Sequence, residues 1–134
     1  MKTNNCNVCR TSIHPLAKLC QRCGKYANRV DIRNRPNKNA RIKALRDAWD
    51  GNHFKCYYSG VVLEEINSKS PLYVSFDHRT PRDEDDIVVA AACINDMKTD
   101  MSEIEFRAVV IALSKAFQGG TIDEKIFNLK YWKR

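Results

Sequence analysis

The stretch "SFDHRTPRDEDDIVVAAACINDMK", Ser75 to Lys98, decides the fold that we predict for this chain. In the segment "PLYVSFDH" apolar and polar side chains alternate, so Asp77 and His78 are expected at the end of a strand. An acidic loop follows, and then an apolar run from Ile87 to Ile94. The periodicity of this run fits either one helix or a strand that leads into a helix. A carboxylate, an imidazole and an amide therefore lie close together around a hydrophobic segment.

The order of these residues resembles the motif of HNH endonucleases, which belong to the ββα-metal or His-Me finger superfamily. The motif has an Asp-His pair, a polar loop, a polar residue before an apolar strand, and then N-x-x-K. The upstream "CYYSGVVL" is similar to the strand and turn that precede it, so the resemblance covers roughly residues 54–106. It implies a ββα-metal nuclease core and the hydrolysis of DNA phosphodiester bonds.

The resemblance also implies roles for individual residues. His78 takes the place of the general base, and Asp77 and Asn95 take the places of the residues that hold Mg²⁺ or Mn²⁺. Hydrolysis of a phosphodiester needs a base for water, a cation for the phosphate and stabilisation of the leaving oxygen. The family implies one catalytic metal ion and products with a 5′-phosphate and a 3′-hydroxyl.

Asp86 stands where the motif has its middle Asn, which ties the loop and positions the histidine. This is a departure, because a carboxylate accepts hydrogen bonds but cannot donate them as an amide does. Arg79, Arg82 and Lys98 surround the motif and are expected to bind phosphates of the substrate. The alternative for these three cations is ion pairing with the acidic residues 83–86.

Two CxxC pairs near the N-terminus predict a structural zinc site. They contain Cys6, Cys9, Cys20 and Cys23. Four thiolates close a tetrahedral Zn²⁺ site, so this ion would hold structure and do no chemistry. The alternatives are two disulfides, or His14 in the place of one cysteine. Cys56 and Cys93 lack the partners that a second zinc site needs, and we expect both to be small buried apolar residues.

The charge of the chain is uneven. The formal net charge is +7, with +10 in residues 1–55 and −3 in residues 56–134. We predict a zinc ribbon over residues 1–30, a basic linker and helix over 31–52, and the nuclease domain over 53–134. Arg41, Lys43 and Arg46 of the predicted helix are expected to contact the DNA backbone. A solvated amphipathic helix is the alternative.

The C-terminal part is predicted to be helical and to complete the core. Ser102 and Glu105 form a capping box. An apolar stripe at helical spacing follows, which consists of Phe106, Val109, Val110, Leu113 and Phe117. Gly119 and Gly120 are expected to end this helix, and a shorter helix is expected from Thr121. The fold class is thus α+β, a ββα-metal core with C-terminal helices and a small N-terminal zinc ribbon.

The sequence predicts a metal-dependent HNH endonuclease that acts on DNA, most simply on double-stranded DNA. The first alternative is a zinc-ribbon protein that binds nucleic acid through a degenerate, non-catalytic HNH core. The second is a zinc ribbon that docks on other proteins. The chain has no apolar run long enough to span a bilayer and no apolar region behind its N-terminal lysine, so we expect a cytoplasmic protein.

Overall fold

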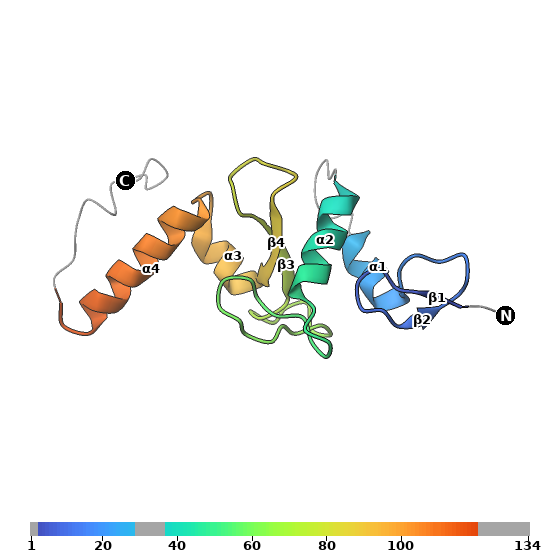
Figure 1. The fold of residues 1–134 in the computed structure, drawn as a ribbon. Helices are drawn as coiled ribbons and strands as arrows, with labels where there is room; N and C mark the ends of the chain where they lie inside the picture. The colour runs from blue at the N-terminus through green and yellow to red at the C-terminus, as the bar shows by residue number, and fades with distance from the viewer. Residues whose placement is uncertain (1–2, 29–36, 121–134) are drawn as a thin grey trace.

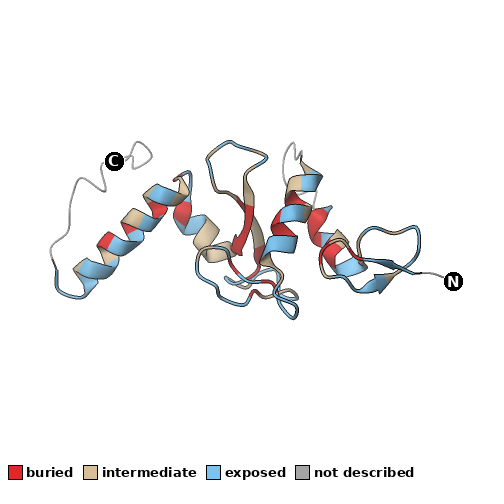
Figure 2. Cartoon of the chain, in the orientation of Figure 1, coloured by how far each residue is buried: buried red, intermediate tan, exposed pale blue. Residues whose placement is uncertain are grey.

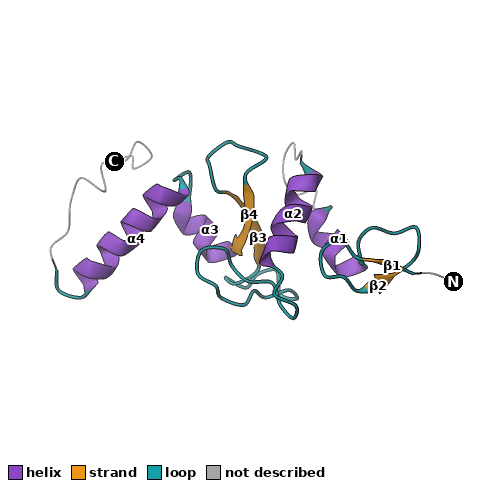
Figure 3. Ribbon diagram, viewed as in Figure 1, coloured by secondary structure: helices purple, strands orange, loops and turns teal. Residues whose placement is uncertain are grey.

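The computed structural model describes residues 3–28 and 37–120. These residues form four helices and two small antiparallel sheets (Figures 1 and 3). A β-hairpin and the helix after it lie at the centre of an elongated molecule, with the cysteine-rich segment on one side and the last helix on the other (Figure 1). None of the described helices combines the length and the apolarity that a membrane crossing requires.

The N-terminal part is a minimal hairpin followed by two helices. The hairpin pairs β1 (Asn4–Asn5) with β2 (Ser12–Ile13), and the helices are α1 (Gln21–Ala27) and α2 (Lys38–Ala48). The thiol of Cys20 caps α1 by accepting from the amide of Cys23, and the Asn37 side chain caps α2 by accepting from Ala40. These caps satisfy amides that have no partner inside the helix, so side chains just before each helix fix where it starts.

The central unit has the order strand, strand, helix. It consists of β3 (Val74–His78), β4 (Ile87–Ala91) and α3 (Ala92–Lys98). The strands are antiparallel, with His78 opposite Ile87 and Val74 opposite Ala91. The ambiguous apolar run is therefore a strand that leads into a helix. The strand that the resemblance implies within "CYYSGVVL" is not a full strand, since the segment before β3 makes only isolated bridges such as Lys55 with Val62.

One hydrophobic core joins the cysteine-rich segment to the central unit (Figure 2). Tyr26 of α1 is 1% exposed, and its ring lies edge-on to Phe54, with 6.0 Å between the ring centroids. Leu45 of α2 and Cys56 are buried in the same cluster, while Cys93 is only half-buried against it. The three units predicted from the sequence thus share this core, because α1 and α2 cover apolar side chains that the small hairpin cannot cover alone.

The helix α4 (Glu103–Phe117) begins as predicted. The hydroxyl of Ser102 accepts from the amide of Glu105 at 3.2 Å, and the Glu105 carboxylate accepts from the amide of Ser102 at 3.0 Å. The capping box is therefore confirmed. Gly119 follows the helix with a φ of 91°. The shorter helix expected from Thr121 lies outside the described residues.

The prediction that the whole apolar stripe of α4 belongs to the core is wrong. Phe106 and Val109 are buried and pack with Met101, but Val110 is 40% exposed and Phe117 is 84% exposed. Only the first turns of α4 lie against the central unit, and the rest of the helix extends away from it (Figure 2). The spacing of apolar residues was correct for a helix, but no described element covers the second half of this face.

Candidate metal centre and polar cavity

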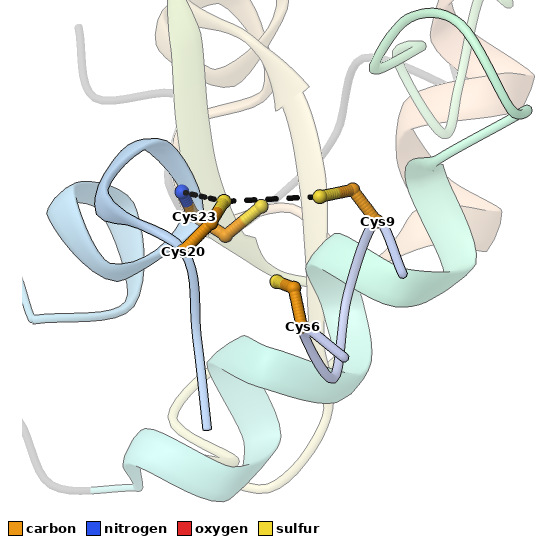
Figure 4. Close-up of side chains that lie close together, drawn as sticks. All are labelled: Cys6, Cys9, Cys20 and Cys23. Carbon is orange, nitrogen blue, oxygen red and sulfur yellow. Dashed lines mark hydrogen bonds between the residues drawn. The ribbon is translucent and has the colours of Figure 1, made fainter. Parts of the chain in front are cut away.

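Four cysteine side chains converge at the N-terminal end of α1. Cys6 and Cys9 lie on the turn of the β1–β2 hairpin, Cys20 caps α1, and Cys23 lies in its first turn. Their sulfur atoms lie within 4.8 Å of one another, and the side chains point toward a common centre (Figure 4). A tetrahedral ion with bonds of about 2.3 Å places its sulfur ligands about 3.8 Å apart. The four cysteines are thus placed to hold a metal ion such as zinc.

Backbone amides around this cluster favour the thiolate form that metal binding needs. Burial raises the pKa of Cys6, but backbone hydrogen bonds outweigh burial and lower it to about 6. The amide of Val8 lies 3.5 Å from the Cys6 sulfur, and the amide of Cys23 lies 3.4 Å from the Cys20 sulfur. Burial raises the pKa of Cys23 instead. A bound cation would therefore be required for all four sulfurs to be deprotonated together.

The alternatives raised for these cysteines do not match the geometry. All six cysteines of the chain are free thiols, so the two disulfides are absent. The ring of His14 is exposed, and its Nδ1 accepts from the amide of Leu16 at 3.1 Å. It does not belong to the group of converging ligand atoms, which contains the four cysteines alone within the described part of the chain.

A second site is a polar cavity of about 250 Å³ between the end of β3, the loop after it and the end of α3. Five of the residues singled out in the sequence line it, namely Asp77, His78, Arg82, Asn95 and Lys98. The hairpin brings them together because β3 ends beside the helix that β4 leads into. Residues about 20 positions apart in the sequence thereby line one small cavity.

Asp77 is buried at the base of this cavity with a side chain that is 5% exposed. Its Oδ2 accepts from the hydroxyl of Tyr58 at 2.5 Å and lies 3.2 Å from the ammonium of Lys98. Burial raises the pKa of the Asp77 carboxyl, although Tyr58 and Lys98 act in the opposite direction. Within the described residues all its hydrogen bonds and ion pairs use Oδ2, so Oδ1 remains available to a ligand.

Lys98 is held inside the protein rather than at the surface. Its side chain is 1% exposed, and its ammonium donates to the carbonyl of His78 at 2.8 Å as well as pairing with Asp77. The ammonium thus fixes the last residues of β3 against α3. The phosphate contact predicted for Lys98 stays a prediction, and in this structure the side chain positions Asp77 and His78.

The side-chain amide of Asn95 has one defined orientation. Its nitrogen donates to the hydroxyl of Ser75 at 2.6 Å and to the carbonyl of Phe76 at 3.1 Å. Because a carbonyl can only accept, the nitrogen must face β3 and the oxygen must face away from it. The Asn95 oxygen has no hydrogen bond among the described residues, so it can serve as a ligand for a cation.

His78 stands at the end of β3 with a side chain that is 40% exposed. Its Nε2 lies 3.2 Å from a carboxylate oxygen of Glu84 but makes no hydrogen bond within the described part of the chain. The carboxylate of Glu84 is therefore close to the imidazole of His78, but the two groups are not oriented for a hydrogen bond. Glu84 and Tyr58 are neighbours of the site that the sequence did not reveal, and so is Asp100, which also lines the cavity.

Asp86 lies outside the cavity and closes the loop that leads from His78. Its carboxylate accepts from the guanidinium of Arg79 at 2.8 Å and from the hydroxyl of Thr80 at 2.7 Å. Its backbone carbonyl accepts from the amide of Arg79 at 2.9 Å. Burial raises the pKa of Asp86, but Thr80 and Arg79 outweigh it and lower the pKa overall. The Asp86 carboxylate thus joins the two ends of this loop, although it only accepts hydrogen bonds and donates none.

Most of the cations predicted to bind DNA already have a partner within the protein, and two of them, Arg41 and Lys98, are buried. Arg41 is buried with 6% exposed and donates to the carbonyl of Ala27, which removes it from the surface on which a phosphate contact was expected. Arg46 donates to the carbonyl of Asn7. Lys43 pairs with Asp47 on the surface of α2. Arg82 is exposed and lines the cavity, with no ion pair among the described residues.

Comparison of the chain with protein-family models, with curated proteins and with solved structures gives no match. The two sites are therefore defined by their own geometry. One is a closed group of four cysteines that suits a structural metal ion. The other is a polar cavity that combines a buried carboxylate, a fixed amide oxygen and an imidazole.

Proposed function

We propose that this protein is a metal-dependent endonuclease of the HNH type that hydrolyses phosphodiester bonds of DNA. The observation that carries the proposal is the polar cavity in which Asp77, His78 and Asn95 meet at the end of β3. The strand, strand, helix order of the central unit is the order expected for a ββα-metal core. A resemblance in the order of residues is thus supported by their proximity in space.

Asp77 and Asn95 are proposed to hold Mg²⁺ or Mn²⁺. Each offers one oxygen that no described residue occupies, and hard divalent cations prefer carboxylate and amide oxygens. Mg²⁺ is usually held by one or two protein oxygens, with substrate and water completing its coordination. When bound, such an ion polarises the phosphate and stabilises charge on the leaving oxygen.

His78 is proposed to accept the proton of the attacking water. An imidazole suits this step because a small environmental shift moves it between its two forms near neutral pH. Lys98 and Asp86 are positioning residues. Lys98 holds the carbonyl of His78, and Asp86 closes the loop that begins after it. The four cysteines are proposed to bind Zn²⁺, which would stabilise the N-terminal segment on the shared core and leave no open position for chemistry.

The test is incubation of supercoiled plasmid with the purified protein, with Mg²⁺ or with no divalent cation. The His78→Ala variant is compared with His53→Ala, which removes an exposed imidazole elsewhere on the surface. We expect nicked or linear plasmid from the wild type and from His53→Ala, only with Mg²⁺, and none from His78→Ala. Cleavage by His78→Ala would refute the assignment of the base. A plasmid that is bound but left intact by the wild type with Mg²⁺ and with Mn²⁺ would point to the non-catalytic nucleic-acid-binding protein.

A further inference from the structure

A basic groove lies beside the cysteine cluster, and none of its lining residues belongs to the polar cavity. Its volume is about 560 Å³, and it is open to solvent. Three lysines line it, namely Lys18 before α1, Lys25 within α1 and Lys38 at the first position of α2. All three side chains are exposed. The described lining contains no acidic residue, and its other polar side chains include the amides of Gln21 and Asn28.

Within the residues that the structure describes, none of these three lysines makes an ion pair, whereas several other cations do, such as Arg22 with Glu65 and Lys55 with Asp50. Three ammonium groups that no described carboxylate pairs with lie around one surface, and such a surface favours the binding of an anion. The groove is therefore one place where positive charge of the described N-terminal residues is available to a partner.

We propose that this groove binds the phosphate backbone of double-stranded DNA. No aromatic ring lines it within the described residues, so it offers no platform on which a single base or nucleotide would stack. Ammonium groups spread over α1, α2 and the segment before α1 suit a row of phosphates, since duplex DNA carries one charge per roughly 1.7 Å of its axis.

The groove also lies next to the loop that leads from the polar cavity. Lys38 follows Asn37, and the side chain of Asn37 donates to the carboxylate of Asp85 in that loop. The start of α2 is thus attached to the segment that follows His78. A duplex that occupies the groove would reach the neighbourhood of the cavity. This inference rests on the proposed function for the identity of the partner, but it assigns binding to residues other than the catalytic ones.

The test compares two triple variants that remove three positive charges each. Lys18, Lys25 and Lys38 are replaced by Gln in the groove variant. Lys55, Lys69 and Lys115, which are exposed elsewhere, are replaced by Gln in the control variant. Binding of a short fluorescent DNA duplex is measured by anisotropy without divalent cation, so that cleavage does not interfere. The salt concentration is varied from about 50 to 200 mM, the range over which phosphate contacts change affinity strongly.

We expect the groove variant to bind the duplex at least about tenfold more weakly than the wild type. The slope of log affinity against log salt should fall in magnitude by about two to three, because each phosphate contact contributes about 0.9. The control variant should stay close to the wild type in both respects. Equal losses in the two variants, or no loss in either, would overturn the proposal. Groove-dependent binding to anionic lipid vesicles, with duplex binding unchanged, would also overturn it.

The same variants separate this inference from the proposed activity. If the groove variant binds duplex more weakly but the wild type never cleaves plasmid, DNA binding by the groove is supported and the nuclease proposal is refuted. If the wild type cleaves plasmid but the groove variant binds duplex equally well, the nuclease proposal is supported and DNA binding by the groove is refuted.

Discussion

Replacement of Lys98 by Met is the sharpest test of how the polar cavity is held together. Met keeps the length and the apolar stem of the side chain but removes the ammonium. The Lys98 side chain is 1% exposed, and the Asp77 side chain that it pairs with is 5% exposed. The substitution therefore leaves a buried carboxylate whose remaining partner is the hydroxyl of Tyr58, and it frees the carbonyl of His78.

The expected loss of stability follows from these contacts. Removal of one partner of a buried ion pair costs about 3–5 kcal/mol, because the other charge is left uncompensated. This is a large part of the roughly 5–15 kcal/mol that typically stabilises a domain. For a chain of this size it corresponds to a decrease in Tm of roughly 10–20 °C. The double variant Lys98→Met with Asp77→Asn should lose less than Lys98→Met alone, since a neutral amide does not need the ammonium.

The assay is urea unfolding followed by circular dichroism at neutral pH. Lys43→Met is the matched control, because Lys43 pairs with Asp47 on α2 with side chains that are 76% and 66% exposed. That exposed pair should contribute only about 0.3–0.5 kcal/mol. A loss below about 1 kcal/mol in Lys98→Met, or a double variant no more stable than Lys98→Met, would show that the buried pair does not stabilise the cavity as argued.

Three further predictions concern the same two sites. Burial raises the pKa of the Asp77 carboxyl from its ordinary value of 3.8. The protonated carboxyl therefore contributes to the stability of the folded protein, and this contribution is lost as the pH rises through the pKa that Asp77 has in the folded state. Stability of the wild type relative to Asp77→Asn should thus decrease from acidic to neutral pH in urea unfolding, and an increase would contradict the argument. Cys9→Ser should lower the zinc content measured by mass spectrometry and loosen the shared core, whereas Cys93→Ser should retain the metal. Glu84→Gln removes a charge 3.2 Å from His78 without a hydrogen bond, so plasmid cleavage should remain within about threefold of the wild type, and its loss would make Glu84 part of the machinery.

Features that depend on short distances along the chain could be predicted from the sequence. The capping box of Ser102 and Glu105 spans one helical turn, and its two hydrogen bonds follow from that spacing. The four cysteines form a closed group because each CxxC pair places two sulfurs on one side of a common centre, where they could hold a metal ion. The helix that contains Arg41 was also predicted within residues 31–52 and is present as α2.

What the tertiary structure decided is which partner each side chain meets. Arg41 belongs to a basic helix by sequence, yet it is buried against the carbonyl of Ala27 because α1 covers that face of α2. The apolar face of α4 leaves Phe117 exposed because no described element packs over it. Tyr58 and Lys98 converge on the carboxylate of Asp77 from distant positions in the chain. Spacing determines contacts within a turn or a hairpin, whereas contacts between segments depend on which surfaces the packed core brings together.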